Sequence, residues 1–509
     1  MKKIISVLLA AILIFSLSLC AFAIDKDHKI TDPYSNIDWS AVNTYKTALH
    51  THTNASDGDP TLKQSIERHI ETGFDIIGTT DHGTVNYSWA EPCPNKLIHG
   101  ALSLVGKSEG ELEYLGTNGT FANGMSYTYG TAANGDDYLV TDSGRNILRL
   151  PYGIENNAVS VNAHVNSWFT DYCDNSITQY EDAVRSINKR GGICVINHPG
   201  EYTKARYELH TEDAYNESNP SYSYYINKYA SLLENNEGCI GIDMNSKGDN
   251  RTRFDRKLWD ILLTRFAANG ENVFGIASSD AHQLSVIDTG FSLLLMEDLT
   301  NENAREALKN GEFFAASHCL GNYDELTEIA AALKEFYGAN ELYNAVNDSA
   351  EAMRTRVEAI ESGEMPADED ISITYSVLDN DGFTKYDTFP SVSAITVNEA
   401  EDTIKIDTEN ALLIRWISNG KLIAVQKADG TEFDINDYED VLGDYVRAEI
   451  FGEGGMLYTQ AFLLDAEEKA GTSDVTGFYL NAGVLDFLFA VFNNWKEIII
   501  RFFAALIHC

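Results

Sequence analysis

The feature that most constrains the fold is an alternation that runs from about residue 45 to residue 282. Short apolar runs typical of buried strands are separated by helical stretches, and nearly every run ends in His, Asp or Glu. Strands that alternate with helices pair in parallel, so their carboxyl ends meet at one face of the fold. The sequence therefore predicts an α/β fold with chemically active side chains gathered at one face.

The first apolar run ends in His50-Thr51-His52, and Asp57-Gly58 then turns the chain. Residues i and i+2 of a strand share a face, so the two imidazoles are expected to point the same way. Imidazole is the commonest metal-binding side chain, so this pair predicts a metal site. Two surface histidines before a loop are the alternative.

Later strand ends repeat this chemistry. A helix expected over 61–72 ends at Gly73, and the run that follows it, 74–80, leads to Asp81-His82. The metal-binding residue types that end the later runs are Glu155, His164, His198, Asp243, Asp280 and His282. Each could be a capping or core residue by itself. Their recurrence at one strand end after another favours a shared metal centre.

Taken together, these motifs resemble the PHP (polymerase and histidinol phosphatase) superfamily of metallo-phosphoesterases. The residues that carry the resemblance are His50-x-His52 with Asp57, Thr80-Asp81-His82, Gly153-Ile154-Glu155, His164, His198-Pro199 and Asp280-x-His282. A segment at 307–314 resembles one that often follows the last motif. The resemblance covers about residues 45 to 318 and implies a distorted, TIM-like (β/α)7 barrel, which we assign to 45–320.

The resemblance also implies two to three divalent metal ions and a role for each residue. His50, His52, Glu155 and Asp280 would hold the first metal, Glu155, His164 and His198 the second, and Asp57, His82 and His282 the third. Glu155 would bridge two metals, and the predicted catalytic residues are Glu155, Asp280 and His282. Asp57 stands where some relatives have His.

Histidine-rich ligand sets suit Zn²⁺, Mn²⁺ or iron better than Mg²⁺. Two bridged cations about 3.5–4 Å apart turn a shared water into a hydroxide nucleophile near neutral pH. The predicted function is hydrolysis of a small phosphomonoester, such as a nucleotide or sugar phosphate. The alternatives are a phosphodiester or oligonucleotide hydrolase, and a non-catalytic metal-dependent binding protein at the cell surface.

Residues 83–149 interrupt the alternation with Gly, Asn, Thr and Tyr, and we expect an insertion of loops and short strands. It is either a wall or lid of the site or a surface decoration. Candidate phosphate contacts, each of which could instead be a solvated loop residue, are Lys204, Arg206, Lys247, Arg251 and Arg253. Aromatic residues that could stack on a base or sugar, or pack in the core, are Trp168, Tyr202, Tyr222, Tyr224 and Tyr225.

The C-terminal half changes character. Residues 324–361 predict an acidic helical linker, and the loop after it marks a domain boundary. Short alternating runs over 371–465, with a hairpin signal at Asn419-Gly420, predict an immunoglobulin-like β-sandwich as an accessory domain. No catalytic constellation occurs in these runs.

The two ends of the chain predict where it acts. Residues 1–23 have a basic start, an apolar core and an Ala-Phe-Ala cleavage site, typical of a signal peptide, so a secreted or cell-surface protein is expected. Residues 484–509 predict an amphipathic helix that contacts a membrane surface or a protein, or packs on its own domain. A net charge of −40 argues against duplex nucleic acid as a partner.

Overall fold

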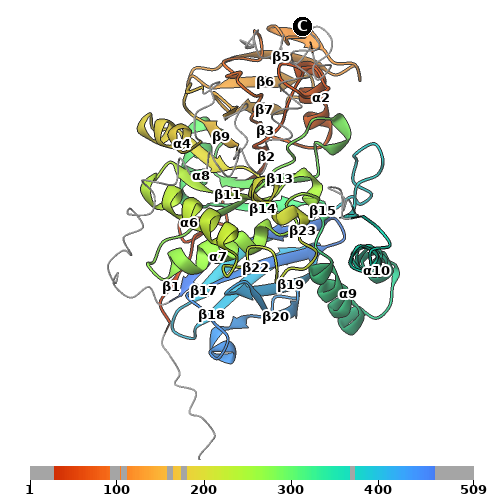
Figure 1. Ribbon diagram of the computed structural model, residues 1–509. Coiled ribbons are helices and arrows are strands. Elements are labelled where there is room, and N and C mark those ends of the chain that lie inside the picture. The colour runs from red at the N-terminus through yellow and green to blue at the C-terminus, as the bar shows by residue number, and fades with distance from the viewer. Residues whose placement is uncertain are drawn as a thin grey trace, which may run out of the picture.

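The computed structural model describes residues 28–91, 104, 112–156, 164–173, 180–366 and 373–464. The predicted signal peptide, 1–23, and the predicted amphipathic helix, 484–509, lie outside these residues. The described chain is a mixed α/β structure with several sheets, in which helices and strands alternate through the first two thirds (Figure 1). None of the helices among these residues is both long and apolar enough to cross a bilayer.

A five-stranded sheet lies beside the predicted site. Its order is β12 (Phe274–Ala277), β11 (Cys239–Asn245), β10 (Ile193–Ile196), β9 (Val165–Trp168) and β8 (Ile154–Asn156). The β10–β11–β12 pairs are parallel, whereas β9 runs antiparallel to both of its neighbours. Helices α4 (Tyr180–Lys189), α6 (Pro220–Asn235) and α7 (Asp255–Ala267) connect these strands. The alternation read from the sequence is thus present in this sheet.

The remaining barrel-like strands belong to a 14-stranded sheet, the largest of the described sheets. Its middle is β14 (Phe313–Ser317), β13 (Gly290–Met296), β2 (Asn43–Ala48), β3 (Ile76–Ile77) and β7 (Asn146–Arg149). Strands β2, β3 and β7 pair in parallel, and β13 is antiparallel to β2 and β14. Helices α2 (Leu62–Glu71) and α8 (Asn301–Asn310) connect strands of this sheet.

The expected seven-stranded barrel is not confirmed, because the ladders of the described strands do not close. Two isolated parallel bridges join the sheets where the ladders stop, Thr51 with Ala281 and His82 with Glu155. Side chains from both sheets nevertheless share one apolar cluster, since Ile76, Val195 and Ile276 pack together. The two sheets therefore face a common core and meet at the strand ends that carry the predicted ligands.

The insertion at 83–149 forms an antiparallel meander of β4 (Asn118–Thr120), β5 (Ser126–Thr131), β6 (Asp137–Thr141) and β7, which extends the large sheet. Figure 1 shows these strands at the top of the molecule, next to α2. Leu112, Glu113 and Tyr114 line a small hollow with Thr53 and Asn54, just beyond the His-x-His motif. The insertion therefore includes a wall beside the predicted site as well as outer strands.

The C-terminal strands do not form an immunoglobulin-like sandwich of their own in the described residues. Strands β22 (Tyr445–Gly452), β23 (Gly455–Tyr458), β24 (Phe462–Leu464), β19 (Ala411–Ser418) and β20 (Lys421–Lys427) join the large sheet, because β23 pairs with β14. Strands β17 (Ser391–Asn398), β18 (Thr403–Glu409) and β21 (Phe433–Asp434) form a separate sheet, and β15 (Cys319–Leu320) pairs with β16 (Tyr375–Ser376). The sandwich prediction is not confirmed.

Two local predictions for this half can be compared with the structure. Asn419 and Gly420 have φ of +49° and +66° and join β19 to β20, so the predicted hairpin is present. The acidic segment 324–361 forms two helices that pack on each other, α9 (Tyr323–Tyr337) and α10 (Glu341–Glu361), rather than one. Gly338, with φ of +76°, ends the first of them.

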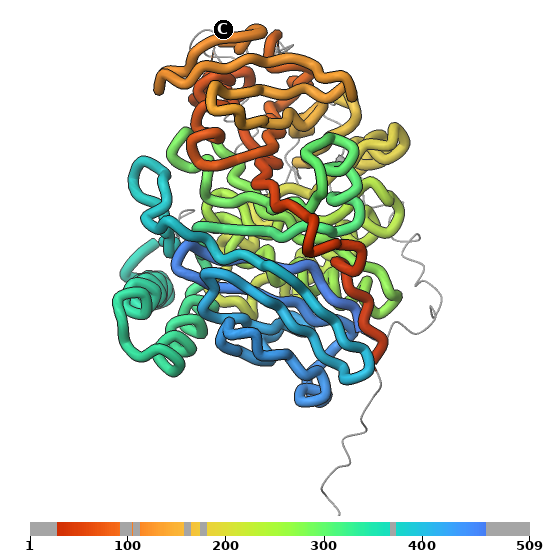
Figure 2. The backbone as a smooth tube through the Cα atoms, turned by 180° about the vertical axis from the view of Figure 1, so that it is seen from behind, coloured from red at the N-terminus to blue at the C-terminus, as the bar shows by residue number. Residues whose placement is uncertain are grey.

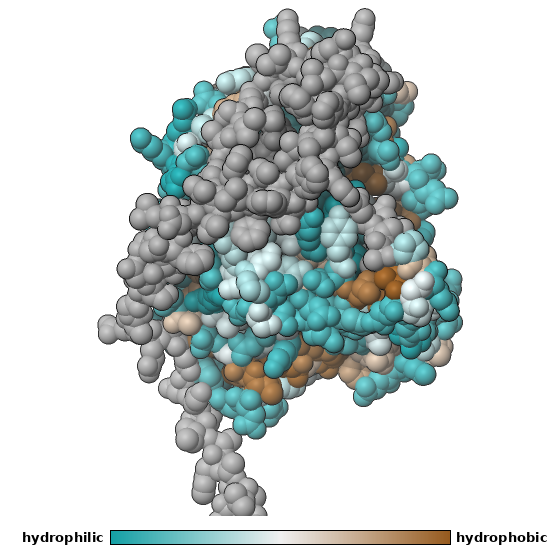
Figure 3. Space-filling view, viewed as in Figure 1, coloured by the Kyte–Doolittle hydropathy of each residue, from teal (hydrophilic) through white to brown (hydrophobic). Residues whose placement is uncertain are grey.

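The chain ends of the described region meet. Strand β1 (Ile30–Thr31) pairs with β24, and Figure 2 shows the red N-terminal segment running beside the blue C-terminal strands. The face drawn in Figure 3 is largely hydrophilic where it is coloured, with brown patches mainly in its lower half. Four cysteines of the described chain are free thiols, and two of them, Cys194 and Cys239, are buried in the core.

Candidate metal centre

The two isolated bridges bring the predicted ligands together. The Thr51–Ala281 bridge sits between His50 and His52, so both imidazoles project to the same side. The backbone N–H of His52 donates to Ala281 O at 2.9 Å, and the N–H of Glu155 donates to Thr80 O at 3.1 Å. Main-chain hydrogen bonds thus hold together residues 229 positions apart in the first pair and 75 positions apart in the second.

Glycines allow these close approaches. A Cβ at Gly153 would lie 2.2 Å from Thr79 O, so a side chain there would push the strand of Glu155 away from that of His82. A Cβ at Gly58 would lie 2.7 Å from the carbonyl of His52. The two motifs Asp57-Gly58 and Gly153-Ile154-Glu155 therefore need glycine because neighbouring backbone occupies that space.

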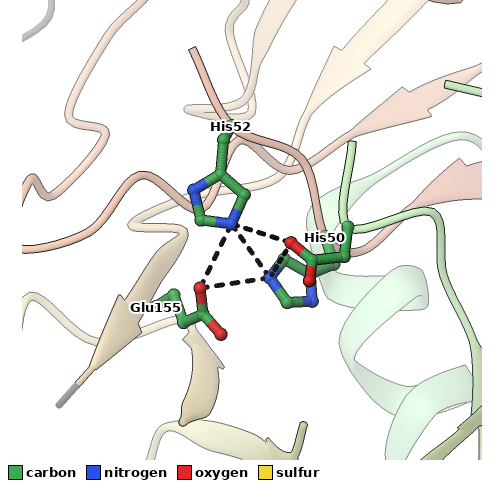
Figure 4. Close-up of side chains that lie close together, drawn as sticks. His50, His52 and Glu155 are labelled. Atoms are coloured by element: carbon green, nitrogen blue, oxygen red, sulfur yellow. Dashed lines mark hydrogen bonds and ion pairs between the residues drawn. The ribbon is translucent and has the colours of Figure 1, made fainter. Parts of the chain in front are cut away.

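The first group of donors is compact and buried. His50 Nε2, His52 Nε2, Glu155 Oε2 and Asp280 Oδ1 lie together: the two nitrogens are 3.1 Å apart, and each lies 3.1–3.3 Å from both carboxylate oxygens. Figure 4 shows His50, His52 and Glu155 pointing toward one another. A metal about 2.0 Å from four tetrahedral ligands would hold them about 3.3 Å apart. The spacing of these four atoms therefore fits one divalent ion.

Glu155 faces two sets of histidines. Its Oε2 contacts His50 and His52 as above, and its Oε1 lies 3.0 Å from His164 Nδ1 and 3.3 Å from His198 Nε2. Asn197 Nδ2 also donates to Oε1 at 2.8 Å and orients the carboxylate. This two-sided arrangement is what a bridging carboxylate requires.

The third predicted group lies at the open side of the cluster. Asp57 Oδ2 is 3.7 Å from His82 Nε2 and 3.4 Å from His282 Nε2, and Asp57 Oδ1 is 3.4 Å from His52 Nδ1. The side chains of Asp57 and His282 are 26% and 35% exposed, whereas that of His50 is fully buried. A substrate would therefore approach from the Asp57 and His282 side.

The charges of the cluster favour the binding of a cation. Burial favours neutral forms, yet Asp280 and Glu155 outweigh it and raise the pKa of His50 to about 9. The pKa of Glu155 lies well below its usual range because burial is outweighed by the surrounding histidines, and the pKa of Asp280 is lowered mainly by His50 and Lys247 against burial. Although buried, Asp280 Oδ1 accepts no hydrogen bond. Two buried carboxylates with imidazole donors around them form a set suited to divalent metal ions.

Neighbouring groups hold the ligands in place. Asp81, which the motif placed beside His82, accepts from Thr53 N, Thr53 Oγ1 and Ser56 Oγ, each at 2.7 Å, so it fixes the turn after His52. Asp243 Oδ2 lies 3.9 Å from His50 Nδ1 and accepts from Ser278 Oγ at 2.5 Å. These supports orient the imidazoles, as carboxylates behind metal-binding histidines commonly do.

Two ligand positions carry backbone strain. His198 and Asp280 have φ of +27° and +46°, values that residues with a side chain rarely adopt. Such conformations cost of order 1–3 kcal/mol each and cluster at functional sites. Strain at two of the nine predicted ligands supports a functional role for the cluster.

The five candidate cations separate in the structure. Lys247 reaches the cluster, with its Nζ 2.5 Å from Asp280 Oδ2 and 3.3 Å from Glu201 Oε2. Arg206 and Arg251 donate to Glu201 Oε1 at 3.3 and 2.7 Å. Arg253 donates to three backbone carbonyls and is structural, and Lys204 lines a neighbouring pocket.

Glu201 and Asn197 are site residues that sequence reasoning missed. Glu201 lies three positions after His198 on the short helix α5 (Pro199–Thr203), and its Oε2 is 3.6 Å from His198 Nδ1. That i, i+3 spacing is the signal that could have identified it. Asn197 precedes His198 at the strand end, but an amide there carries no distinctive pattern.

The aromatic candidates also separate. Tyr202 packs against the rings of His198 and His164, with centroid separations of 5.7 and 5.2 Å. Trp168 and Tyr224 are buried in apolar clusters, which agrees with the alternative that they pack in the core. Tyr222 and Tyr225 pack in the core and also line the pocket beside Tyr202.

Neither a family model nor a curated protein matches this chain. Among solved structures, a two-domain protein from Bacteroides vulgatus containing a predicted PHP-like metal-dependent phosphoesterase has a TM-score of 0.31 and 13% identity, and the match covers 86% of this chain and 98% of that one. The lesion-specific endonuclease PfuEndoQ from Pyrococcus furiosus has a TM-score of 0.27 and 12% identity, covering 52% and 56%. Likeness at this level assigns neither fold nor activity to the chain.

Proposed function

We propose that this chain is a metal-dependent phosphoesterase of the PHP type that hydrolyses a small phosphomonoester outside the cell. The observation that carries the proposal is the group of four donor atoms spaced 3.1–3.3 Å apart, next to a carboxylate whose second oxygen faces two more histidines. The resemblance of the motif order to the PHP superfamily supports the same reaction class. Zn²⁺, Mn²⁺ or iron are the proposed metals.

Each residue has a proposed task. His50, His52, Glu155 and Asp280 would hold one ion, Glu155, His164 and His198 a second, and Asp57, His82 and His282 a third. Ions held in this way activate water and neutralise charge that develops on the phosphoryl oxygens. His282 Nδ1 donates to Asp280 O at 2.9 Å, which leaves its Nε2 facing Asp57.

Lys247 has a second proposed task. Its ammonium holds Asp280 Oδ2, so that Oδ1 stays directed at His50 and His52. Burial lowers the pKa of Lys247, but the charges of Asp280 and Glu201 outweigh burial and raise it, so the ammonium stays charged at neutral pH. A fixed positive charge at this edge also attracts an anionic substrate, which the strongly acidic protein surface would otherwise repel.

Metal removal and reloading tests the proposal. The purified mature chain is treated with a chelator, reloaded separately with Zn²⁺, Mn²⁺ or Fe²⁺, and assayed for bound metal and for phosphate release from a phosphomonoester and a phosphodiester. At least two ions per chain and metal-dependent release from the monoester are expected. Tight metal binding without release from either ester would instead favour a binding protein, and release from the diester alone would favour the phosphodiesterase alternative.

The proposed location and attachment need separate tests. Export rests on residues 1–23, and surface or partner contact rests on residues 484–509. N-terminal sequencing of the protein recovered outside expressing cells should begin near Ile24. Deletion of residues 480–509 should leave phosphate release intact and reduce binding to lipid vesicles or self-association.

A further inference from the structure

A pocket of about 400 Å³ lies beside the cluster, bordered by the end of α5, the short turn η1 (Ala205–Tyr207) and the start of α6. Four of its wall residues are tyrosines, namely Tyr202, Tyr207, Tyr222 and Tyr225. This volume is within the range of small-molecule binding sites. None of the nine predicted metal ligands lines it, so it is separate from the metal cluster.

Tyr202 connects the pocket to the cluster. One part of its ring packs against His198, at an interplanar angle of 29°, and against His164, while the side chain also lines the pocket. The pocket therefore begins one aromatic ring away from the proposed ligands of the second metal. A leaving group attached to a phosphate at the cluster could extend into it.

Several polar groups of the pocket have protein partners. The hydroxyl of Tyr222 donates to Glu208 Oε1 at 2.5 Å, and that of Tyr207 accepts from Arg206 Nη2 at 2.5 Å. Thr203 Oγ1 donates to Tyr215 at 3.1 Å, and Asn219 accepts from the backbone of Ser221. These bonds fix several of the polar side chains, and the four tyrosines supply the aromatic part of the wall.

We propose that this pocket binds the base of a nucleoside monophosphate whose phosphate lies at the metal cluster. The inference rests on the proposed phosphoesterase function and narrows its substrate class. Aromatic faces stack on a planar ring and do so with little dependence on which base is present. A bare sugar has no planar ring to stack in this way. Lys204 at the wall adds positive charge beside an anionic substrate.

The test compares adenosine 5′-monophosphate with ribose 5-phosphate, using the metal-loaded full chain. In both esters the phosphate leaves the 5-position oxygen of ribose, with adenosine or ribose as the alcohol released, so the base is the main difference between them. One stacked base contributes about tenfold or more to kcat/KM, and we expect the parent to prefer the nucleotide by that factor. Tyr207→Leu should bring the ratio toward one. Tyr337→Leu is the matched control, because Tyr337 is an exposed tyrosine of α9 that lines no part of the pocket.

The outcomes separate the two proposals. Release of phosphate from both esters at equal kcat/KM, or a preference that Tyr207→Leu leaves unchanged, would overturn the base pocket and leave the phosphoesterase standing. If metal-loaded protein hydrolyses neither ester, the phosphoesterase fails, and calorimetry with adenosine alone then decides the pocket. Adenosine binding that Tyr207→Leu abolishes and Tyr337→Leu retains supports it, and no binding to the parent overturns it.

Discussion

The molecule contains two buried clusters of charge that are built in opposite ways. In the metal centre, imidazole nitrogens and carboxylate oxygens face one another at 3.1–3.3 Å with no arginine among the predicted ligands. In the second cluster, which we call the arginine network, each guanidinium lies between carboxylates. Its members are Arg256, Arg415, Arg447, Asp249, Asp260, Glu325 and Glu449.

The arginine network supplies its own counter-charges. Arg256 donates two bonds of 2.9 Å to Asp249, and Arg447 donates bonds of 2.7 and 2.8 Å to Asp260. A bidentate arginine–carboxylate pair satisfies the guanidinium donors and the carboxylate acceptors together, and the arginine side chain keeps its charge when buried. The metal centre instead concentrates acceptor atoms around carboxylates and depends on an external cation. Buried charge by itself therefore does not mark a functional site; the kind of partner does.

The arginine network also joins the two halves of the chain. Asp249 and Asp260 precede the predicted linker, whereas Arg415, Arg447 and Glu449 follow it, and Glu325 lies on α9. Asp249 additionally accepts from the backbone N–H of Gly321 at 2.6 Å, and it closes the loop that begins at Lys247. The loop that presents Lys247 to the metal centre is thus linked to the C-terminal strands indirectly, through Arg256, Glu325 and Arg415.

Breaking the network should give the largest loss of stability. Arg447→Met would leave Asp260 buried without its main partner and Glu449 with Arg415 alone, and such a loss costs about 3–5 kcal/mol. Denaturant unfolding of parent and variant measures it, and bound metal per folded molecule should stay at the parental value. Arg354→Met is the control, because that side chain is 52% exposed and solvent screens its ion pairs. Equal effects of the two substitutions would contradict the distinction drawn here.

Glu155→Gln should have the largest effect on activity. The amide keeps the shape of the side chain and removes the charge that faces both sets of histidines, so we expect loss of at least one metal. A fall in kcat of roughly a hundredfold corresponds to about 3 kcal/mol in the barrier. Metal analysis and phosphate release are measured beside Glu358→Gln, an exposed glutamate of α10. Full metal content and parental turnover would remove Glu155 from its bridging role.

Two buried histidines should respond to pH in opposite directions, because their surroundings differ. Burial lowers the pKa of His69 to about 4; the charge of Asp288 offsets only part of this shift, and the charge of Lys46 increases it. The pKa of His50 is instead raised, because neighbouring carboxylates outweigh burial. Since His69 has an unfolded-state pKa near 6.5, the unfolded chain binds the extra proton between pH about 6.5 and 4, and stability falls as pH falls.

The His69 contribution between pH 7.5 and 5 should be about 2 kcal/mol. Unfolding free energies of the parent and His69→Leu at the two pH values measure it, because the variant lacks this titration. The difference between variant and parent should move by that amount in favour of the variant at pH 5. A difference that is independent of pH would show that His69 does not titrate as its burial requires.

Asp57→Ala should have the smallest effect on activity. Asp57 is assigned to the third predicted metal alone and is partly exposed, although it also lies 3.4 Å from His52 Nδ1, so its loss should reduce kcat less than about tenfold, under 1.4 kcal/mol. Metal titration of the variant should show loss of the weakest site and retention of the other two. A loss as large as that of Glu155→Gln would make Asp57 a ligand of the main pair.

How far the sequence predicts the site can be judged residue by residue. The nine predicted ligands come together in one cluster, because strand ends of an α/β fold converge and each motif supplies a donor there. Their roles as ligands stay predictions. The supports Glu201 and Asn197 are not identified from the sequence, and Asp243 is identified only as a strand-end carboxylate, since their function depends on which neighbour their side chains meet.

The fold shows the same division. Local patterns, such as the Asn419-Gly420 turn and the alternation of strands and helices, are set by the conformational preferences of a few consecutive residues, and these the sequence determined. Whether β23 would pair with β14, which of five cations would reach Asp280, and whether the ladders would close were decided by tertiary structure. Those contacts join residues tens to hundreds of positions apart. They depend on which strand edges remain free and on which side chains fit the remaining space. A pattern of a few consecutive residues determines neither property.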